Sequence, residues 1–234
     1  MKTNIQGKSK LVNSVFSQVN TKYDLMNDIM SFGIHRIWKN KFIDWMRPQP
    51  KKSLIDVASG TGDIAKLFYK KSKKSCQITC IEPNLKMFKK GKLNLKNISE
   101  ITWINASAEK LPIPDNTFDY YSISFGMRNV TNIDSALKEA FRVLKPGGRF
   151  MCLEFSKVDN EILKFVYDQY SKTIPTIGKL IVGSEKPYEY LVESIKKFYN
   201  QEQLAMIIKR NGFSEVSFRN LTNGIAAIHS GWKI

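Results

Sequence analysis

The first fifty residues carry hydrophobic side chains at helical spacing. Two sets follow the i, i+3, i+4 pattern of one helix face: Val12, Val15, Phe16 and Val19, then Ile34, Ile37, Trp38, Phe42 and Trp45. The segment "RPQP" at 47–50 ends this pattern, because proline cannot continue a helix. Residues 1–50 are therefore predicted to be helical.

Short apolar runs alternate with amphipathic segments over residues 51–157. The runs typical of buried strands are "SLIDVA", "QITCIEP", "ITWINA", "FDYYSISFG" and "RFMCLEFS". The segments typical of helices are "GDIAKLFYKKSK", "NLKMFKKGKLNL" and "DSALKEAFRVLKPGG", the last of them closed by proline and glycine. Strands that alternate with helices at this spacing predict a parallel sheet with helices on both faces.

The alternation ends near residue 158. Two aromatic-rich segments, "ILKFVYDQYSKTIPTIGKLIVG" and "PYEYLVESIKKF", predict a helical insertion after the fifth strand. "QEQLAMIIKRNGF" predicts a last helix, and "SEVSFRNL" and "GIAAIHSGWKI" predict two strands joined by "TNG", a strong hairpin signal. The pattern predicts a single α/β domain with seven strands, the last pair antiparallel, in four parts: residues 1–50, 51–157, 158–199 and 200–234.

The net charge of +16 comes mostly from lysines that are spread along the whole chain. A nucleic-acid-binding protein more often concentrates lysine and arginine beside aromatic residues. Spread lysine is compatible with solubility, and also with attraction to an anionic membrane surface. Charge alone does not choose between these two.

The composition excludes several other classes. No apolar run reaches the roughly 20 residues of a membrane-spanning helix, and the N-terminal segment lacks the apolar block of a signal peptide, so a cytoplasmic protein is expected. Cys76, Cys80 and Cys152 are an odd number without a CxxC pair, which favours buried thiols over a disulfide framework or a zinc site. Two histidines, His35 and His229, do not predict a metal centre.

The stretch "LIDVASGTGDIA" at 54–65 places Gly60 and Gly62 between the first strand and its helix. Ligands of an open parallel sheet lie beyond the carboxyl ends of the strands, and glycines let the backbone approach them closely. The loop is not a phosphate-binding P-loop, because Gly62 is followed by Asp63 rather than by lysine. The third glycine of a dinucleotide-binding loop is replaced by Ala65, so the loop by itself is weak evidence.

Acidic residues indicate the kind of ligand. Asp56 and Asp63 flank the loop; they would repel a pyrophosphate but suit S-adenosylmethionine, which carries an ammonium and a sulfonium. Glu82 ends the second strand, where an acid can accept hydrogen bonds from both ribose hydroxyls. A solvated acid at a strand end is the alternative interpretation of Glu82. The segment "NASAEKLPIPDNTFD" adds small polar residues after the third strand, where an adenine would lie.

Long stretches of the chain resemble the ubiquinone/menaquinone biosynthesis C-methyltransferases, a family of class I S-adenosylmethionine-dependent methyltransferases. They are "VFSQVNTKYDLMNDIMSFGIHRIWK", "FGMRNVTNIDSALKEAFRVLKPGGRFMCLEFS", "YEYLVESIKKF" and "LTNGIAAIHSGWK". The resemblance covers nearly the whole chain and implies a Rossmann-like fold with an N-terminal helical lid. It also implies C-methylation of a polyprenylated quinol ring, either 2-methoxy-6-polyprenyl-1,4-benzoquinol or demethylmenaquinol or both.

The resemblance also implies which residues contact the methyl donor. Carried over onto this sequence, they are Thr61, Glu82, Ser107, Ala108 and Ser124, beside Asp56, Gly60 and Gly62 of the loop region. Two positions depart from the family pattern. Ser59 stands where glycine is usual, which is expected to shift the backbone slightly, and Glu82 stands where many members have aspartate.

Catalytic roles are implied for Arg128 and Asn129 in "SFGMRNV", at the carboxyl end of the fourth strand. A guanidinium stays protonated, so Arg128 is expected to stabilise a phenolate or to orient a water rather than to act as a base. The alternative is a structural ion pair between Arg128 and Asp119 or Glu139.

Other residues are weaker candidates. Tyr23 is expected to reach the donor or the ring from the lid. His35 is a candidate proton acceptor, although a lone histidine among apolar neighbours is more often structural. Aromatic residues of the insertion either line the route for an isoprenoid tail or form a helical core: Phe165, Tyr167, Tyr170, Tyr188 and Tyr190.

The expected partners follow from this resemblance. They are the polyprenylated quinol and, through peripheral contact, the inner face of a membrane; a homodimer or a quinone-biosynthesis complex stays open. An RNA or DNA methyltransferase is the rival, suggested by the pI near 9.7. The sequence has neither an Asp/Asn-Pro-Pro-aromatic tetrapeptide nor a Pro-Cys nucleophile, so no nucleic acid is expected. A methyltransferase for another lipid-like small molecule is a second alternative.

Overall fold

The structure, a computed structural model, describes residues 7, 31, 33–158, 169–170, 173–176, 179 and 185–234. The helix predicted around 12–19 and most of the one predicted over 162–183 lie outside these residues.

The described residues form one mixed sheet of seven strands. The strands are β1 Lys52–Val57, β2 Cys76–Ile81, β3 Ile101–Ile104, β4 Phe118–Ser124, β5 Leu144–Phe155, β6 Ser214–Leu221 and β7 Ala226–Trp232. Their order is β3-β2-β1-β4-β5-β7-β6. The first five pair in parallel, and β7 runs antiparallel to both β5 and β6. The predicted seven strands with an antiparallel last pair are confirmed.

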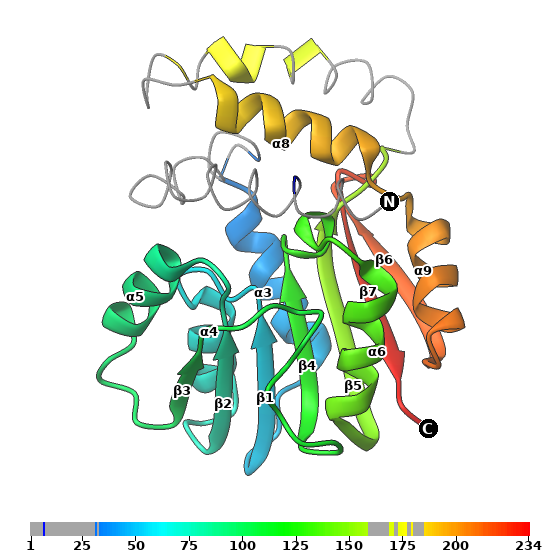
Figure 1. Cartoon of the computed structure of the whole chain (residues 1–234). Helices are drawn as coiled ribbons and strands as arrows, with labels where there is room; N and C mark the ends of the chain where they lie inside the picture. Colours follow the sequence, from blue (N-terminus) through cyan, green and yellow to red (C-terminus); the bar gives the residue numbers. More distant parts are fainter. Residues whose placement is uncertain are drawn as a thin grey trace.

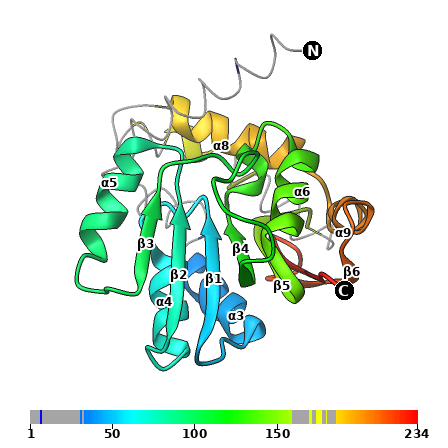
Figure 2. The ribbon, with the colours of Figure 1, turned by 60° about the horizontal axis from the view of Figure 1, so that its bottom comes forward.

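Helices cover both faces of this sheet (Figures 1 and 2). They are α3 His35–Met46, α4 Asp63–Lys71, α5 Leu85–Asn94, α6 Ile133–Val143, α8 Lys186–Lys197 and α9 Gln201–Arg210, with the short 3-10 helix η1 Met127–Asn129. One core lies between the sheet and α3 with α4, and the other lies between the sheet and α6 with α9. Neighbouring strand residues serve opposite cores: Leu54 points into the first and Ile55 into the second, as the two-residue period of a strand requires.

The N-terminal helix α3 matches its predicted pattern and its predicted end. Trp38, Phe42 and Met46 are buried on its inner face. The helix ends at Met46, and Arg47 adopts a left-handed conformation with a φ of 53° just before the predicted proline stop. The apolar spacing therefore places α3 against the sheet, beside α4.

The predicted end of α6 needs one correction. The segment "LKPGG" at 144–148 was expected to close the helix, but α6 ends at Val143, and β5 already begins at Leu144. Leu144 has an extended backbone, with a ψ of 140°, and pairs with Phe118 of β4. Tertiary pairing with β4 therefore starts the strand before the proline and the glycines.

The predicted "TNG" hairpin is confirmed. Thr222 and Asn223 have φ values of 48° and 52°, and Gly224 has a φ of 92°. The Gly224 amide donates to the Leu221 carbonyl oxygen, so Thr222 and Asn223 are the central residues of the turn. Positive φ at both central residues gives a hairpin turn the twist that suits its flanking strands. The hairpin joins β6 to β7 and thereby inserts β7 beside β5.

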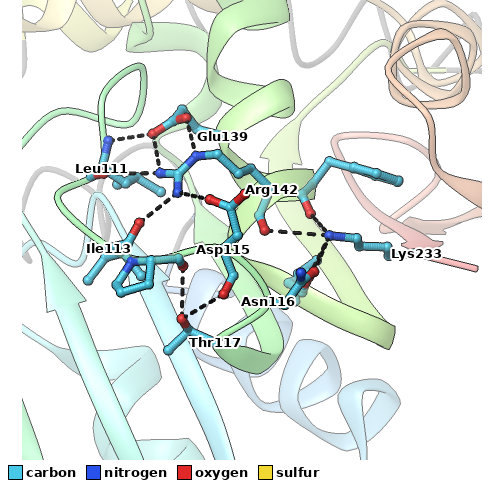
Figure 3. A network of polar contacts seen from close by, with 11 residues as sticks. Leu111, Ile113, Asp115, Asn116, Thr117, Glu139, Arg142 and Lys233 are labelled. Atoms are coloured by element: carbon cyan, nitrogen blue, oxygen red, sulfur yellow. Dashed lines mark hydrogen bonds and ion pairs between the residues drawn. The ribbon is translucent and has the colours of Figure 1, made fainter.

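A polar network lies at the end of the sheet where the parallel strands begin, next to the first residues of β4 (Figure 3). The Arg142 guanidinium pairs with Glu139 and with Asp115, each at 2.7 Å. The Lys233 ammonium donates to Asn116 Oδ1 at 2.7 Å and to backbone carbonyls at the end of α6. These contacts tie the loop before β4 and the C-terminal residues to α6, away from the glycine loop.

Cys76, Cys80 and Cys152 are buried free thiols, as predicted.

In the described part of the chain, no helix combines the length and the apolar composition needed to cross a bilayer. Helix α8 lies across the carboxyl ends of the parallel strands, above the end of β4 (Figure 1).

Candidate active site

The glycine loop joins β1 to α4 through three left-handed residues. Ala58, Gly60 and Gly62 have φ values of 53°, 58° and 89°. Ser59, which replaces the glycine usual in the resembling family, has no positive φ, so a side chain is accommodated without backbone strain. The Ser59 hydroxyl instead donates to the Asp56 carbonyl oxygen at 2.6 Å.

A pocket lies at the carboxyl edge of the sheet, between this loop, the end of β4 and α3. Its lining includes four residues predicted to contact the methyl donor: Asp56, Gly60, Thr61 and Ser124. The other lining residues are Lys39, Ala58, Ser59, Asp63, Ile64 and Phe125. The sheet topology therefore brings the end of β1 and the end of β4 together, as the parallel arrangement predicts.

Two buried oxygen atoms beside this pocket lack hydrogen-bond partners among the described residues. They are Asp56 Oδ2 and Ser124 Oγ. Asp56 is 1% exposed, and its Oδ1 accepts a hydrogen bond from Ser122 at 2.6 Å. Burial raises the pKa of Asp56 to about 7. Buried polar atoms are nearly always satisfied, so these two atoms indicate a ligand that donates hydrogen bonds or carries a positive charge.

The second acid of the loop region has a partner that the sequence did not reveal. Lys39 of α3 is buried and pairs with Asp63 at 2.6 Å. Partial burial opposes ionisation of Asp63, but the Lys39 ammonium outweighs it and holds the pKa of Asp63 below its ordinary value. Both acids were expected to face a cationic ligand. Because Lys39 already neutralises the charge of Asp63, only Asp56 is left to bind a cationic group of the ligand.

A signal for Lys39 was present in the sequence. Lys39 follows His35 by four residues and precedes Phe42 by three, so it lies on the apolar stripe of α3. A lysine on the buried face of a helix needs a counter-charge, which here comes from the loop.

Glu82 is buried at the end of β2 and contacts the glycine loop. Its Oε2 accepts a hydrogen bond from the Gly60 amide, and its Oε1 accepts one from the Asn84 amide, both at 2.9 Å. Burial raises the pKa of Glu82 to about 7, although the two backbone amides act in the opposite direction. A solvated strand-end acid is excluded, because Glu82 is only 6% exposed.

Three further predicted donor residues do not line the pocket. Gly62 starts α4, where an added Cβ would meet the Leu95 side chain at 2.5 Å. Ser107 is exposed and Ala108 is buried, both beyond β3. They follow the strand beyond β2, on the Glu82 side of the edge.

Arg128 is buried in an ion pair, but not with either expected partner. Its Nη1 contacts Glu154 Oε1 at 2.7 Å and donates to the Phe125 carbonyl oxygen at 2.7 Å. Asp119 instead pairs with two lysines, and Glu139 pairs with Arg142. The signal for the correct partner was Glu154 itself, an acid inside the apolar run "RFMCLEFS".

Asn129 connects η1 to α8. Its Oδ1 accepts a hydrogen bond from the Tyr190 hydroxyl at 2.9 Å, and its Nδ2 donates to the Phe125 carbonyl oxygen at 3.4 Å. The carbonyl of Phe125 is therefore shared by Arg128 and Asn129. The sequence did not indicate this polar contact of Tyr190.

The weaker candidates have mixed outcomes. Tyr23, Phe165 and Tyr167 lie outside the described residues. His35 is 2% exposed, and its Nδ1 lies 3.0 Å from Ser31 Oγ, which is the setting of a structural histidine. Tyr188 is fully buried in the core against α3, so a core role is supported for it.

Comparisons with known proteins identify the fold class. A SAM-dependent methyltransferase of Thermotoga maritima has the same fold, with a TM-score of 0.65, 18% identity and coverage of 94% of this chain and 99% of that one. The predicted class I, Rossmann-like methyltransferase fold is confirmed.

Sequence comparisons identify the family within this fold class. The ubiE/COQ5 methyltransferase family matches residues 3–233, and the chain belongs to this family. A protein of Rickettsia akari called ubiquinone/menaquinone biosynthesis C-methyltransferase UbiE is 52% identical over 97% of this chain and 94% of its own length. A protein of the same name from Brucella anthropi is 51% identical over 97% of this chain and 89% of its own length. The predicted family and the prediction of a methyltransferase are confirmed.

Proposed function

We propose that this protein transfers a methyl group from S-adenosylmethionine to a ring carbon of a polyprenylated quinol in ubiquinone or menaquinone biosynthesis. Family membership over nearly the whole chain carries this proposal. It is supported by relatives of that name that are about half identical to this chain. The unsatisfied acceptors of the pocket supply independent support from the geometry.

The pocket residues fit this donor. Asp56 Oδ2 would accept from its ammonium, and Ser124 Oγ lies in the same pocket wall. Glu82 would accept from the ribose hydroxyls with the lone pairs that the backbone amides leave. Thr61 and Gly60 would contribute backbone close to the ligand, while Ser107 and Ala108 would lie toward the adenine.

When bound, S-adenosylmethionine supplies an electrophilic methyl group on a sulfonium. The chain's own residues then have to orient the quinol ring and favour its phenolate form, because the anionic ring carbon is the stronger nucleophile. Asn129 is positioned for this by Tyr190, which holds its side-chain oxygen. Its Nδ2 makes only a long contact of 3.4 Å, which leaves this group available to a ring oxygen.

Arg128 would act mainly by positioning. Its guanidinium is 1% exposed and already donates to Glu154 and to the Phe125 carbonyl oxygen. These bonds hold the chain segment between β4 and η1, which carries Asn129. The positive charge of Arg128 would also favour negative charge developing on the ring nearby.

The four predicted parts of the chain have distinct proposed roles. Within residues 1–50, the part before α3 would close over the site as a lid that carries Tyr23, while α3 packs against the sheet and contributes Lys39 to the pocket wall. Residues 158–199 would cover the acceptor side, since α8 holds Asn129 through Tyr190. Residues 51–157 would bind the donor, and 200–234 would complete the sheet. Closure would exclude water from the reacting pair.

The quinol's isoprenoid tail implies that the protein meets its substrate at a membrane surface. The net charge of +16 supports peripheral attraction to an anionic leaflet. Aromatic residues of the lid or of the insertion would add shallow contacts. The substrate would then enter from the bilayer while the protein stays at its face.

The proposal is tested by methyl transfer from labelled S-adenosylmethionine to short-chain quinols. We expect label in the organic phase with a 2-methoxy-6-prenyl-1,4-benzoquinol or with a demethylmenaquinol, and none with RNA.

Glu82→Ala should weaken S-adenosylhomocysteine binding by about 10- to 100-fold, because it removes charge-assisted hydrogen bonds of about 1.5–3 kcal/mol. Label on RNA and on neither quinol would refute the proposed acceptor, while unchanged affinity of Glu82→Ala would remove Glu82 from the donor site.

A further inference from the structure

A second pocket, of about 400 Å³, lies between the end of α3 and the strands β6 and β7. Lys41, Trp45 and Arg47 line it from the side of α3, and Arg219 and Ile228 line it from the sheet. It shares no residue with the pocket beside the glycine loop. The proposed methyl transfer therefore gives it no role. This second pocket, together with Arg149 behind it, is called the arginine pocket below.

Stacked side chains build the wall of the arginine pocket. The guanidinium of Arg149 lies 5.0 Å from the Trp232 ring centre on one side and 5.2 Å from the Trp45 ring centre on the other. The guanidinium of Arg219 then lies 4.2 Å from the Trp45 ring centre. Cations and aromatic rings thus alternate from β7 through β5 and α3 to β6.

Arg149 holds this wall in place. It is 8% exposed, and its Nη1 donates to the Trp45 carbonyl oxygen at 2.7 Å. Its Nε donates to Ser230 Oγ at 2.8 Å. Arg149 is therefore held between the two rings by hydrogen bonds to β7 and to the last turn of α3.

The positive charges of the arginine pocket are not balanced by the described residues. Arg128, Arg142 and Arg210 each pair with a carboxylate elsewhere in the protein. Arg47, Arg149 and Arg219 make no ion pair within the described ranges, and these three lie together.

The acidic residue in the lining of the pocket does not change this balance. Asp44 also lines the pocket, but it pairs with Lys71 at 2.7 Å. Burial lowers the pKa of Arg149, and the positive charges of Arg219 and Arg47 lower it further, although Tyr120 acts in the opposite direction. Bringing guanidinium groups together without a counter-anion is unfavourable, so a bound anion would relieve the repulsion.

The donor geometry selects the class of anion. Arginine presents planar, forked N–H donors that match the oxygens of a phosphate. Arg47 and Arg219 are both exposed at the pocket, one on each side of it, and Lys41 adds an ammonium. We propose that the arginine pocket binds a phosphate group, either as free phosphate or diphosphate or as the headgroup phosphate of an anionic phospholipid.

The test compares two double variants of the full-length protein with equal charge loss. Arg47→Gln/Arg219→Gln removes two cations of the pocket, while Lys209→Gln/Arg210→Gln removes two cations of α9, on the other face of the sheet. Titration calorimetry with sodium diphosphate at constant ionic strength should show binding by the wild type. The first variant should bind at least about 10-fold more weakly, because it loses charged hydrogen bonds to the phosphate, and the second should bind as the wild type does.

Vesicles distinguish the two sources of phosphate. If the pocket serves lipid headgroups, Arg47→Gln/Arg219→Gln should lose affinity for phosphatidylglycerol vesicles while Lys209→Gln/Arg210→Gln keeps it. If it serves a free phosphate, only diphosphate binding should change. Equal behaviour of both variants toward both probes would overturn the proposal, and so would a wild type that binds neither diphosphate nor anionic vesicles.

One further variant guards against misfolding. Arg219→Lys keeps the charge and loses the planar fork, and its fold is checked by circular dichroism. It should bind diphosphate or anionic vesicles measurably more weakly than the wild type. Unchanged binding of both probes by Arg219→Lys and by the double variant would show that the guanidinium groups are not used.

Discussion

Two carboxyl groups of the active site, Asp56 and Glu82, are buried, which makes their ionisation unfavourable. Burial raises both pKa values to about 7, from ordinary values of 3.8 and 4.5. Between these values the folded protein retains protons that the unfolded chain has released. The contribution of these two groups to the free energy of unfolding therefore falls as the pH rises from about 4 through about 7.

Asp56→Asn should remove part of this pH dependence. The substitution keeps an oxygen for Ser122 and removes the charge that is buried above pH 7. We expect the free energy of unfolding at pH 8 to rise by a few kcal/mol at most, since one pKa unit corresponds to about 1.4 kcal/mol. Urea denaturation at pH 5 and pH 8 measures it.

Asp63→Asn provides the opposite control. The pKa of Asp63 is lowered by Lys39, so its contribution to stability is present at neutral pH and is lost on acidification. Its substitution should therefore destabilise the protein at pH 8. A pH slope that is the same in wild type and Asp56→Asn would contradict the role given to Asp56.

Donor binding should depend on the same ionisation. An ammonium group binds Asp56 only when the carboxylate is charged, which happens as the pH rises through about 7. We expect the affinity for S-adenosylhomocysteine to increase several-fold between pH 6 and pH 8 in the wild type and to increase less in Asp56→Asn, where only Glu82 still ionises in this range. Calorimetric titration across this range measures it, and a falling affinity would exclude Asp56 as the acceptor.

For the buried ion pair of Arg128 and Glu154, we expect a single substitution to lower the free energy of unfolding more than a double substitution. Arg128→Met leaves Glu154 buried without a cation, so the free energy of unfolding should fall by about 3–5 kcal/mol. Arg128→Met/Glu154→Gln removes both charges, so it should recover part of this loss. The recovery is incomplete because the amides of residues 128 and 155 donate to different oxygens of Glu154, and glutamine keeps only one oxygen. Guanidinium chloride denaturation measures both variants.

Turnover then separates stability from function. The double variant should still transfer methyl groups about 100-fold more slowly, as expected for loss of a group that favours negative charge in the transition state. Its affinity for S-adenosylhomocysteine should be kept. Normal turnover in a folded double variant would show that the ion pair is only structural.

At the scale of elements, α5 approaches the glycine loop closely through a glycine of its own. A Cβ on Gly91 would lie 2.8 Å from the Gly60 carbonyl oxygen and 2.2 Å from the Trp103 ring. Glycine lowers helix stability by about 1 kcal/mol relative to alanine, yet here it lets the helix touch the donor loop. The position of the loop is therefore coupled to that of α5.

Gly91→Ala should be destabilising despite the better helix propensity of alanine. We expect a loss of about 1–3 kcal/mol from overpacking, together with weaker S-adenosylhomocysteine binding because the Gly60 carbonyl has to move. Thermal and urea denaturation measure the first effect and calorimetry the second. Lys92→Ala, at an exposed position of the same helix, should change neither, and an equal effect of both substitutions would refute the contact argument.

At the scale of the whole molecule, the positive charge predicts how the protein meets a membrane. Each surface lysine near an anionic leaflet contributes about 1 kcal/mol of attraction. Salt shortens the reach of these charges to about 8 Å at physiological ionic strength. We expect co-sedimentation with anionic vesicles at low salt and progressive release as sodium chloride rises. Equal binding to neutral vesicles would exclude electrostatic attraction.

The sequence by itself determined the elements and their order. The spacing of apolar residues is a local property, with a period of two in strands and 3.6 in helices. The seven strands and the helices α3, α4, α5, α6, α8 and α9 could therefore be placed to within a few residues, except for the early start of β5. Loops with a strong local conformational preference, such as "TNG" and the glycine loop, were readable for the same reason. Asp56, Gly60, Thr61 and Ser124 could be brought together because parallel strands end at one edge.

Only the tertiary structure decided which charges meet. Lys39 pairs with Asp63 across 24 residues, and Arg128 pairs with Glu154 across 26. The arginine pocket likewise joins α3, β5, β6 and β7. Such pairs depend on strand register and on the rotation of each helix about its axis, and no local period encodes either. Side-chain charges can form several pairs of similar energy in an unfolded chain, and the fold selects among them by distance and burial.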